Sequence, residues 1–269
     1  MTGPRVVVVG AGIAGLAAAW ELARAGVPTT VVDSERRAGG MILTERRDGF
    51  VVEGGPDSWL AREPEIPALA TELGVADRIV EQTARGSWLW TGNALRPIEE
   101  GRAAALLGIQ ADAEDLGGGF ASFAAGMGEL IDALRQRLGD TLHTPLGVSG
   151  LTPDGAGWRL AVSGGAMIAA DAVVLALPAY AAGRLLEHVG ASGARALADV
   201  PYLPSVTVSL AYEATQVGAA LEGTGFVAAP GQGGTVRACT YASQKFPGRA
   251  PRGRLLLRAF LGSDWGDEG

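Results

Sequence analysis

The chain begins with a short apolar run, followed by a glycine-rich turn and then by apolar residues at helical spacing. Val6–Val9 are four consecutive valines, and β-branched residues without alternation predict a parallel strand that is buried on both faces. Residues 16–25 predict a helix, which Gly26 ends, and the apolar run at 29–33 predicts a second strand. This order of elements predicts a βαβ unit at the N-terminus.

The rest of the chain alternates between helical and strand patterns. One helix, expected after Gly126, has an apolar face that we interpret as a core stripe: Met127, Leu130, Ile131, Leu134 and Leu138. Further helices are predicted at 65–73 and 102–107, strands at 172–177, 204–213 and within 236–260, and a hairpin that turns at 91–93.

Composition and charge limit the class of protein. The 269 residues are 48% hydrophobic and 19% charged with a formal net charge of −7, which gives no indication of a nucleic-acid partner. One cysteine, Cys239, excludes an internal disulfide and is typical of a reducing compartment. With only two histidines in addition, we expect no metal site, and the N-terminus does not resemble a signal peptide. We therefore expect a cytoplasmic protein.

The glycines after the first strand carry the first chemical signal. Gly10, Gly12 and Gly15 form G-x-G-x-x-G, in which the glycines allow a tight turn, close approach to a pyrophosphate and helix–strand packing. Asp33 follows the second strand, where a carboxylate accepts hydrogen bonds from ribose hydroxyls. The predicted dinucleotide-binding residues in this part of the chain are Gly10, Ala11, Gly12, Ile13, Ala14, Gly15, Asp33 and Ser34.

Two further stretches indicate which dinucleotide binds. After Asp33 the sequence "SERRAGGMILT" places Arg37, Gly39 and Gly40 in a pattern that resembles the extended FAD fingerprint of amine-oxidase-type flavoproteins. The turn "EGGPDSW" resembles the glycine turn that lies near the flavin ring in that superfamily, which adds the segment Gly54, Gly55 and Pro56 to the predicted cofactor contacts. FAD is the cofactor that these resemblances imply.

The later motifs narrow the family. "EGGPDSW", "GMGELIDAL" and "ACTYASQKFPGRAPRG" occur in the order found in bacterial protoporphyrinogen and coproporphyrinogen oxidases, which the chain resembles over nearly its whole length. The resemblance implies oxidation of a porphyrinogen to the porphyrin in haem synthesis, with FAD as the electron carrier, O2 as the acceptor and hydrogen peroxide as product. It also implies cofactor contacts at Leu146, Ala176 and Pro178. No catalytic residue is assigned.

The fold class expected from these patterns is α/β, or α+β overall. A Rossmann-like FAD-binding domain is predicted from residues 1–60 and 121–185, and a mixed, β-rich substrate domain from residues 61–119 and 186–269.

Two departures from the family leave alternatives open. Residues 99–119 stand where family members carry a long helical insertion, and the chain stops at "LGSDWGDEG", where relatives continue. We therefore also consider a non-catalytic FAD-binding remnant, half of a split flavoprotein that needs a C-terminal partner or a second copy, and another amine-oxidase-type oxidoreductase. Peripheral contact with a membrane needs only a modest apolar patch and stays open as well.

Overall fold

The chain folds into two compact units. The computed structural model describes residues 3–108, 113–217 and 221–262. Unit 1 comprises Met1–Leu43 and Leu130–Tyr202, and unit 2 comprises Thr44–Glu129 and Leu203–Gly269. Residues 109–112 of the segment expected to replace the helical insertion, and residues 263–269 at the chain end, lie outside the described residues.

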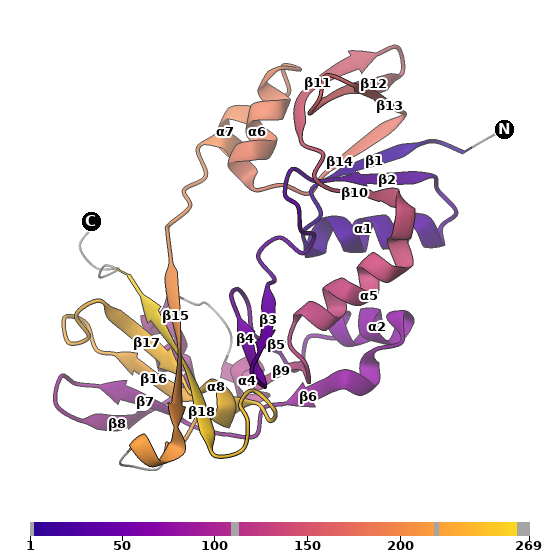
Figure 1. Ribbon diagram of the computed structural model, residues 1–269. Coiled ribbons are helices and arrows are strands. Elements are labelled where there is room, and N and C mark those ends of the chain that lie inside the picture. The colour runs from indigo at the N-terminus through magenta and orange to yellow at the C-terminus, as the bar shows by residue number, and fades with distance from the viewer. Residues whose placement is uncertain (1–2, 109–112, 218–220, 263–269) are drawn as a thin grey trace. The chain divides into compact units, whose positions relative to one another are not determined.

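The central sheet of unit 1 is parallel (Figure 1). Its strands have the order β10-β2-β1-β14, with Val6 paired to Thr29 on one side and to Ala172 on the other. β1 is buried along its whole length, as the uninterrupted valines predict. The bounds are β1 Val6–Val9, β2 Thr29–Val32, β10 Leu142–His143 and β14 Ala172–Leu175.

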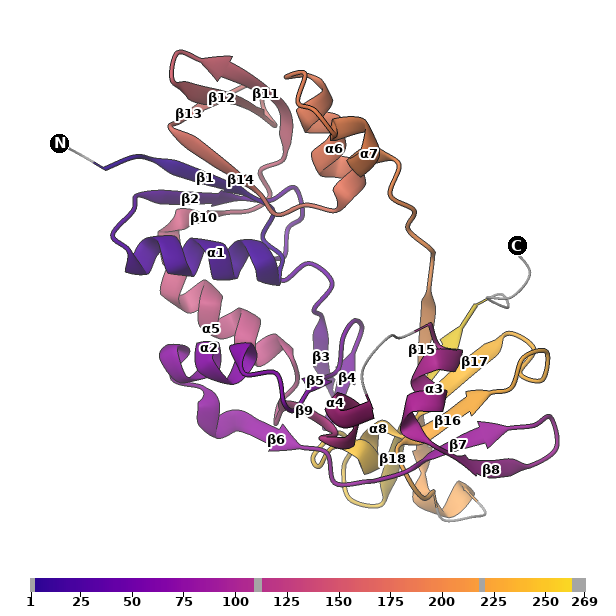
Figure 2. The ribbon, with the colours of Figure 1, turned by 180° about the vertical axis from the view of Figure 1, so that it is seen from behind.

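Two layers cover this parallel sheet, one on each face. The helix α1 (Ile13–Arg24) lies on one face, and an antiparallel meander of β11, β12 and β13 lies on the other (Figures 1 and 2). A hydrophobic cluster joins the sheet to the meander: Val7, Val9, Val32, Leu151, Leu160 and Ala170. The meander strands are Val148–Asp154, Gly157–Val162 and Met167–Ala170.

Three other helices contribute to unit 1. The helix α5 (Gly128–Leu138) runs into unit 1 from residue 130, and the helices α6 (Ala179–Glu187) and α7 (Ala194–Ala198) pack against each other. A side chain at Gly183 would meet Ala198 N at 2.6 Å, so glycine allows this close approach. The short 3-10 turn Gly139–Thr141 follows α5.

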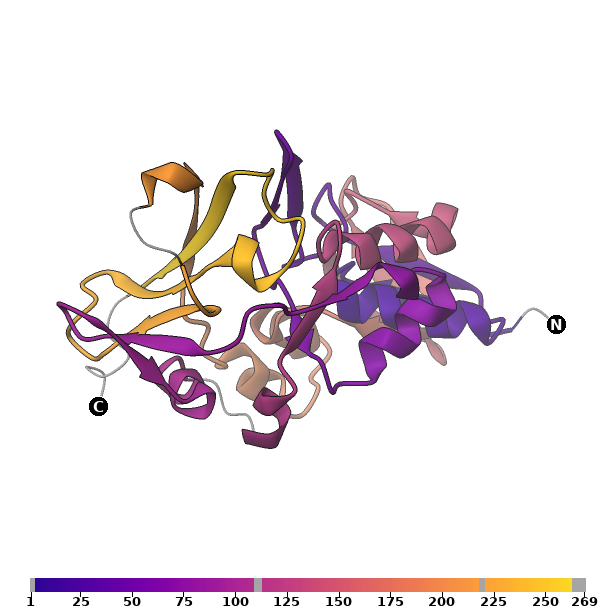
Figure 3. The ribbon, with the colours of Figure 1, turned by 90° about the horizontal axis from the view of Figure 1, so that it is seen from below.

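Unit 2 is built around a six-stranded mixed sheet in the order β15-β18-β17-β16-β7-β8. Figure 3 shows its early strands, in purple, beside the late strands, in orange and yellow. A hairpin of β3 and β4 and a three-stranded sheet in the order β5-β9-β6 complete the β-structure of the described residues. The six strands are β7 Ser87–Trp90, β8 Leu95–Ile98, β15 Val206–Glu213, β16 Gly225–Ala228, β17 Val236–Thr240 and β18 Arg254–Leu261.

Short helices and turns connect these sheets. The helix α3 (Glu100–Leu106) packs on the six-stranded sheet through Ala103, which lies in a buried cluster with Val227 and Ala238. The remaining strands are β3 Thr44–Arg47, β4 Phe50–Glu53, β5 Trp59–Leu60, β6 Ile79–Glu81 and β9 Phe120–Phe123. The remaining helical segments are α2 Glu65–Leu73, α4 Ala113–Gly117, α8 Ala242–Lys245 and the 3-10 turns Ala76–Arg78 and Ala214–Gln216.

The mixed α/β class is confirmed, and so are most predicted elements. The first helix begins at Ile13, earlier than predicted, and the strand predicted at 172–177 ends at Leu175. The predicted stretch 236–260 is divided, because the short helix α8 and a loop separate β17 from β18. All five residues of the predicted core stripe are buried.

The boundaries of the two compact units differ from the boundaries of the two predicted domains. Residues 44–60 and 121–129 fall in unit 2, and 186–202 in unit 1. Hydrogen bonds explain the first two segments: Thr44 Oγ1 donates to Glu53 and accepts from Gly128 N. The cofactor and substrate roles of the two domains stay predictions.

Within residues 3–108, 113–217 and 221–262, no helix is long and apolar enough to cross a membrane. The same described residues hold no group of three or more His, Cys, Asp and Glu side chains that could bind a metal ion.

Candidate functional site

The turn between β1 and α1 needs glycine at two positions for its own packing. Gly10 has φ +107°, and a side chain there would collide with the carbonyl oxygen of Ala176. A side chain at Gly15 would collide with the carbonyl oxygen of Gly10. Both glycines are therefore required by the fold, whether or not a ligand binds.

Gly12 is different, because nothing in the protein requires a glycine there. Its φ is −70°, which suits any residue, and an added Cβ would meet no atom closer than Gly40 Cα at 4.0 Å. Gly12 is the N-cap of α1, no side chain caps that end, and the first turn holds no acidic residue. The free amides of this turn and the open space at Gly12 fit a phosphate group that approaches the backbone closely.

Asp33 lies directly beside this turn, at the end of β2. Its Oδ2 accepts a hydrogen bond from Ala11 N at 2.6 Å, and its Oδ1 accepts one from Glu35 N at 2.8 Å. Each carboxylate oxygen can accept a second hydrogen bond, so the side chain keeps capacity for ribose hydroxyls. The two backbone bonds hold the carboxylate in place next to the glycine turn.

A cleft of about 270 Å³ opens at this end of the sheet. This volume is near the lower end of the roughly 300–1,000 Å³ range of ligand pockets, so the cleft suits one part of a dinucleotide. Three predicted residues line it, Gly10, Asp33 and Ser34. Sequence reasoning missed the other lining residues: Val9, Val32, Val148, Ser149, Leu177, Ala181, Arg184 and Leu185.

Five of the missed residues come from two elements that sequence reasoning did not place at the cleft. Val148 and Ser149 begin β11, and Ala181, Arg184 and Leu185 lie on one face of α6. The spacing of these three residues in α6 is typical of one helix face and could be recognised in the sequence. Which part of the fold that face packs against depends on tertiary structure and could not.

The loop after β2 packs against the glycine turn. Gly39 N donates to Ala11 O at 2.7 Å, and a side chain at Gly40 would meet Gly12 Cα at 3.0 Å. Arg37 holds the loop, because its guanidinium donates hydrogen bonds to the carbonyl oxygens of Ala38, Gly40 and Ile42. The structure therefore brings these predicted residues to the turn, and direct contact of Arg37 with a pyrophosphate stays a prediction.

The predicted residues of the later chain also lie near the turn. Leu146 N donates to Asp33 O at 2.6 Å, and Ala176 N donates to Val9 O at 2.8 Å. Pro178 immediately precedes α6. Ile13 and Ala14 open α1, so every predicted cofactor residue except those at 54–56 belongs to unit 1.

Gly54, Gly55 and Pro56 belong to unit 2, whereas the glycine turn belongs to unit 1. Gly54 and Pro56 are exposed, whereas Gly55 is buried and its carbonyl accepts a hydrogen bond from Arg258 Nη1 at 2.6 Å. Their contact with a cofactor stays a prediction.

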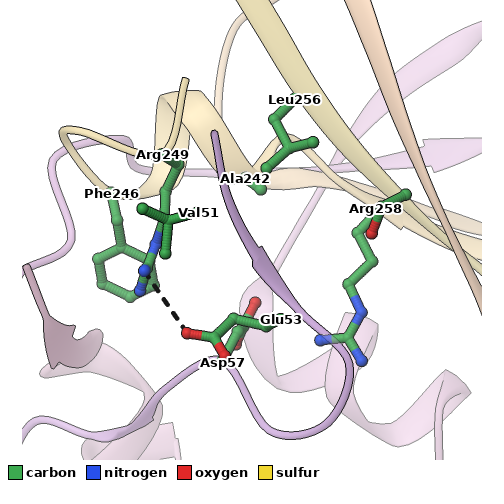
Figure 4. A pocket seen from close by; sticks show the side chains of 9 residues that line it. Val51, Glu53, Asp57, Ala242, Phe246, Arg249, Leu256 and Arg258 are labelled. Carbon is green, nitrogen blue, oxygen red and sulfur yellow. Dashed lines mark ion pairs between the residues drawn. The ribbon is translucent and has the colours of Figure 1, made fainter. Parts of the chain in front are cut away.

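Beneath this second turn lies a group of buried charges that sequence reasoning did not identify as a unit. We name it the charge cluster, and its members are Glu53, Asp57, Lys245, Arg249 and Arg258. Figure 4 shows these residues except Lys245. Lys245 Nζ lies 3.3 Å from Asp57 Oδ1 and donates to Ser58 Oγ at 2.9 Å. Arg249 Nη1 lies 3.5 Å from Glu53 Oε1, and both side chains are almost fully buried.

The pKa values of the two carboxylates of the charge cluster are shifted in opposite directions. Burial raises the pKa of Glu53, and hydrogen bonds from Thr44 and Met127 and the charge of Arg249 offset this only in part. Burial alone would also raise the pKa of Asp57, but Lys245, Ser58 and Arg258 outweigh it and hold that pKa below its ordinary value.

Desolvation also shifts the pKa values of the two arginines in the charge cluster. Burial lowers the pKa of Arg249 and of Arg258, although both stay close to the two carboxylates. Arg249 Nη2 donates to Ser122 Oγ at 2.6 Å, while Arg258 Nε has no hydrogen-bond partner among the described residues. Lys245 and Arg249 belong to the "SQKFPGRAP" motif. The sequence feature that could have indicated the charge cluster is the presence of these two cations between apolar strands.

Comparison with known proteins places this geometry in a family context. The family model described as "Flavin containing amine oxidoreductase" matches residues 13–92 and 75–268, which is most of the chain.

Individual relatives match along nearly the whole chain. The coproporphyrinogen III oxidase of Propionibacterium freudenreichii subsp. freudenreichii is 27% identical over 385 residues, covering 95% of this chain and 72% of the relative. The coproporphyrinogen III oxidase of Bacillus subtilis (strain 168) is 25% identical, covering 98% of this chain and 78% of the relative. The first alignment is longer than this chain, so that relative contains residues without a counterpart here.

Solved structures show the same fold. A candidate protoporphyrinogen oxidase from Exiguobacterium sp. 255-15 superimposes with a TM-score of 0.83 at 23% identity, covering 97% of this chain and 77% of the other. Cyclohexylamine oxidase from Brevibacterium oxydans IH-35A superimposes with a TM-score of 0.75 at 15% identity, covering 97% of this chain and 75% of the other.

Proposed function

Since this chain belongs to the flavin-containing amine oxidoreductase family, we propose that it is an FAD-dependent porphyrinogen oxidase. FAD is the cofactor of the family, and the chain is a flavin oxidoreductase by membership. The observation that carries the proposed substrate is the alignment of coproporphyrinogen III oxidases over 95% and 98% of the chain. The proposed substrate is coproporphyrinogen III or protoporphyrinogen IX, and the proposed pathway is haem synthesis.

The proposed reaction removes hydrogen from the porphyrinogen and delivers it to oxygen. Each oxidation step takes a hydride equivalent and a proton from the substrate, and O2 receives the two electrons and two protons as hydrogen peroxide. FAD, when bound, supplies the hydride acceptor and the route of electrons to oxygen, so the protein contributes binding, orientation and electrostatics.

The residues of unit 1 would hold the dinucleotide. The amides at the start of α1, from Gly12 to Ala14, would bind the phosphates, because no side chain caps this end of the helix. Asp33 would accept hydrogen bonds from the ribose while its own backbone bonds fix its position. Arg37 would keep the Gly39–Gly40 loop against the turn.

In unit 2 the charge cluster would hold the turn that contains the other proposed cofactor contacts, Gly54, Gly55 and Pro56. Arg258 binds the carbonyl of Gly55, and Lys245 binds Asp57 and Ser58, so the turn is held at both ends by buried cations. A turn held in this way presents its backbone to a ligand with little reorganisation.

The direct test is turnover by the purified chain loaded with FAD. Coproporphyrinogen III and protoporphyrinogen IX are offered separately in air, and porphyrin fluorescence and hydrogen peroxide are measured together. The proposal predicts porphyrin formation above the autoxidation rate, with peroxide in stoichiometric amount. A chain that binds FAD but yields neither product would contradict the proposal and favour the second candidate, a non-catalytic or split flavoprotein. That candidate is supported by the length of the first alignment, because the relative contains residues within it that have no counterpart in this chain.

A further inference from the structure

One wall of the cleft in unit 1 is formed by α6 and by Leu177, which precedes Pro178 at the start of that helix. Leu177, Ala181 and Leu185 line the cleft at helical spacing, and Leu177 lies against Gly10, where an added Cβ would meet its Cδ2 at 3.2 Å. This wall is apolar except for one side chain, Arg184.

Arg184 is the one cation among the described residues that line the cleft. Its guanidinium makes no hydrogen bond or ion pair within the described residues, and its contact is with the ring of Tyr180, 5.8 Å from the centroid. The side chain is exposed. Because its guanidinium has no hydrogen-bond or ion-pair partner among the described residues, its donors and its second face are available to a ligand.

The position of Arg184 in the cleft indicates which part of the ligand it meets. The residues of the α1 N-terminus that would bind phosphates, Gly12 to Ala14, do not line this cleft, whereas Asp33 does. Arg184 and Leu185 lie about two helical turns after Leu177, which is near Gly10 of the glycine turn. Val148 and Ser149 of β11 line the same cleft. The cleft therefore suits the nucleoside, with the ribose at Asp33 and the base between apolar side chains.

We propose that Arg184 is a cofactor-binding residue that recognises the adenine base of FAD through its planar guanidinium. A guanidinium is flat, delocalised and weakly hydrated, so it stacks on aromatic faces as an ammonium does not. The apolar residues around it exclude water from the base and strengthen the contact. The inference rests on the assignment of this cleft to FAD.

The test measures binding rather than turnover. Arg184→Ala, Arg184→Lys and the wild-type chain are titrated with FAD, with ADP and with flavin mononucleotide, which lacks adenine. Arg195→Ala is the matched control, because it removes an exposed cation from α7 of the same unit, outside the cleft lining. Thermal unfolding without ligand is measured for all variants, and an unchanged midpoint is expected because Arg184 is exposed.

Arg184→Ala is expected to weaken binding of FAD and of ADP by the same factor, about three- to tenfold, which is the range for a cation on an aromatic ring. Arg184→Lys is expected to recover less than half of this loss on a logarithmic scale, Arg195→Ala to bind as wild type does, and flavin mononucleotide to be unaffected. Unchanged ADP affinity in Arg184→Ala, or full recovery by lysine, would overturn the proposal. A wild-type chain that binds neither FAD nor ADP would instead refute the cofactor site itself, so the two failures are distinguishable.

Discussion

The glycine turn in unit 1 and the turn above the charge cluster in unit 2 are held in place by opposite means. The glycine turn is built from glycines and backbone hydrogen bonds, and Asp33 beside it is held by two amides. The charge cluster is built from four buried ionisable side chains and the half-buried Asp57. Its cations bind the carbonyl of Gly55 and the hydroxyl of Ser58. In the first region the absence of side chains makes room for a ligand, and in the second region long side chains replace water behind an exposed turn.

The difference has an energetic consequence. A backbone turn costs little to maintain once its glycines allow it, whereas buried charges are tolerated only while every partner stays in place. Substitutions in unit 2 should therefore affect stability most, and substitutions in unit 1 should affect ligand binding most. The following predictions test this contrast.

The largest expected effect follows removal of one buried cation. Lys245→Met leaves Asp57 without its nearest positive charge, so the free energy of unfolding should fall by about 3–5 kcal/mol in urea titrations. Arg159→Met is the control, because Arg159 forms an exposed ion pair with Asp154 and its loss should cost less than about 1 kcal/mol. Equal losses in the two variants would show that the charge cluster is not a stability device.

A smaller loss of stability is expected at the tight glycine turn. In Gly15→Ala the new methyl group would collide with the carbonyl oxygen of Gly10, so α1 must shift away from β1. The expected cost is about 1–3 kcal/mol, measured by urea titration of the chain without cofactor. FAD binding should be lost at the same time; a variant as stable as wild type would contradict the packing argument.

The two carboxylates of the charge cluster should give opposite dependences of stability on pH. The pKa of Asp57 is lowered in the folded state, so its stabilisation is present above the unfolded value of about 3.9 and is lost as pH falls through the folded pKa. The pKa of Glu53 is raised, so folding is penalised as pH rises from about 4.3 through the folded pKa.

Unfolding free energies of wild type, Asp57→Asn and Glu53→Gln between about pH 3 and pH 8 would separate these contributions. The destabilisation caused by Asp57→Asn should shrink toward low pH, while the stability of Glu53→Gln relative to wild type should improve toward neutral pH. Parallel curves for all three proteins would refute the assigned directions.

The smallest effect on stability is expected at Gly12. Gly12→Ala introduces a methyl group that meets nothing closer than 4.0 Å, so the free energy of unfolding should change by less than about 0.5 kcal/mol. The same methyl group occupies the space that a phosphate needs, so FAD binding should fall by at least about tenfold. A large loss of stability here would mean that the space at Gly12 is used by the protein.

The contrast also explains what could be predicted from sequence. The βαβ unit, its glycines and Asp33 could be located because each follows a local rule of strand, turn or helix chemistry. The lining of the cleft by Ala181 and Arg184 could not, because it depends on which sheet the face of α6 packs against. The charge cluster was missed for the same reason: residues 53–58 and 245–258 meet only in the folded unit, and no local pattern signals their pairing.

The units themselves were also less predictable than the elements. The hairpin of β3 and β4 follows the glycine loop directly in sequence, which suggested one domain, but Thr44 and Glu53 bond to each other and to the start of α5. Such hydrogen bonds between distant segments decide the compact units, and single-sequence patterns do not report them.

The most direct test of the account is the visible absorption spectrum of the purified chain after incubation with FAD and gel filtration, with Gly12→Ala measured in parallel. The account predicts flavin bands that co-elute with the wild-type protein and are absent from the equally folded variant. A wild-type chain that elutes folded and colourless would contradict the claim that the backbone of unit 1 forms an FAD site.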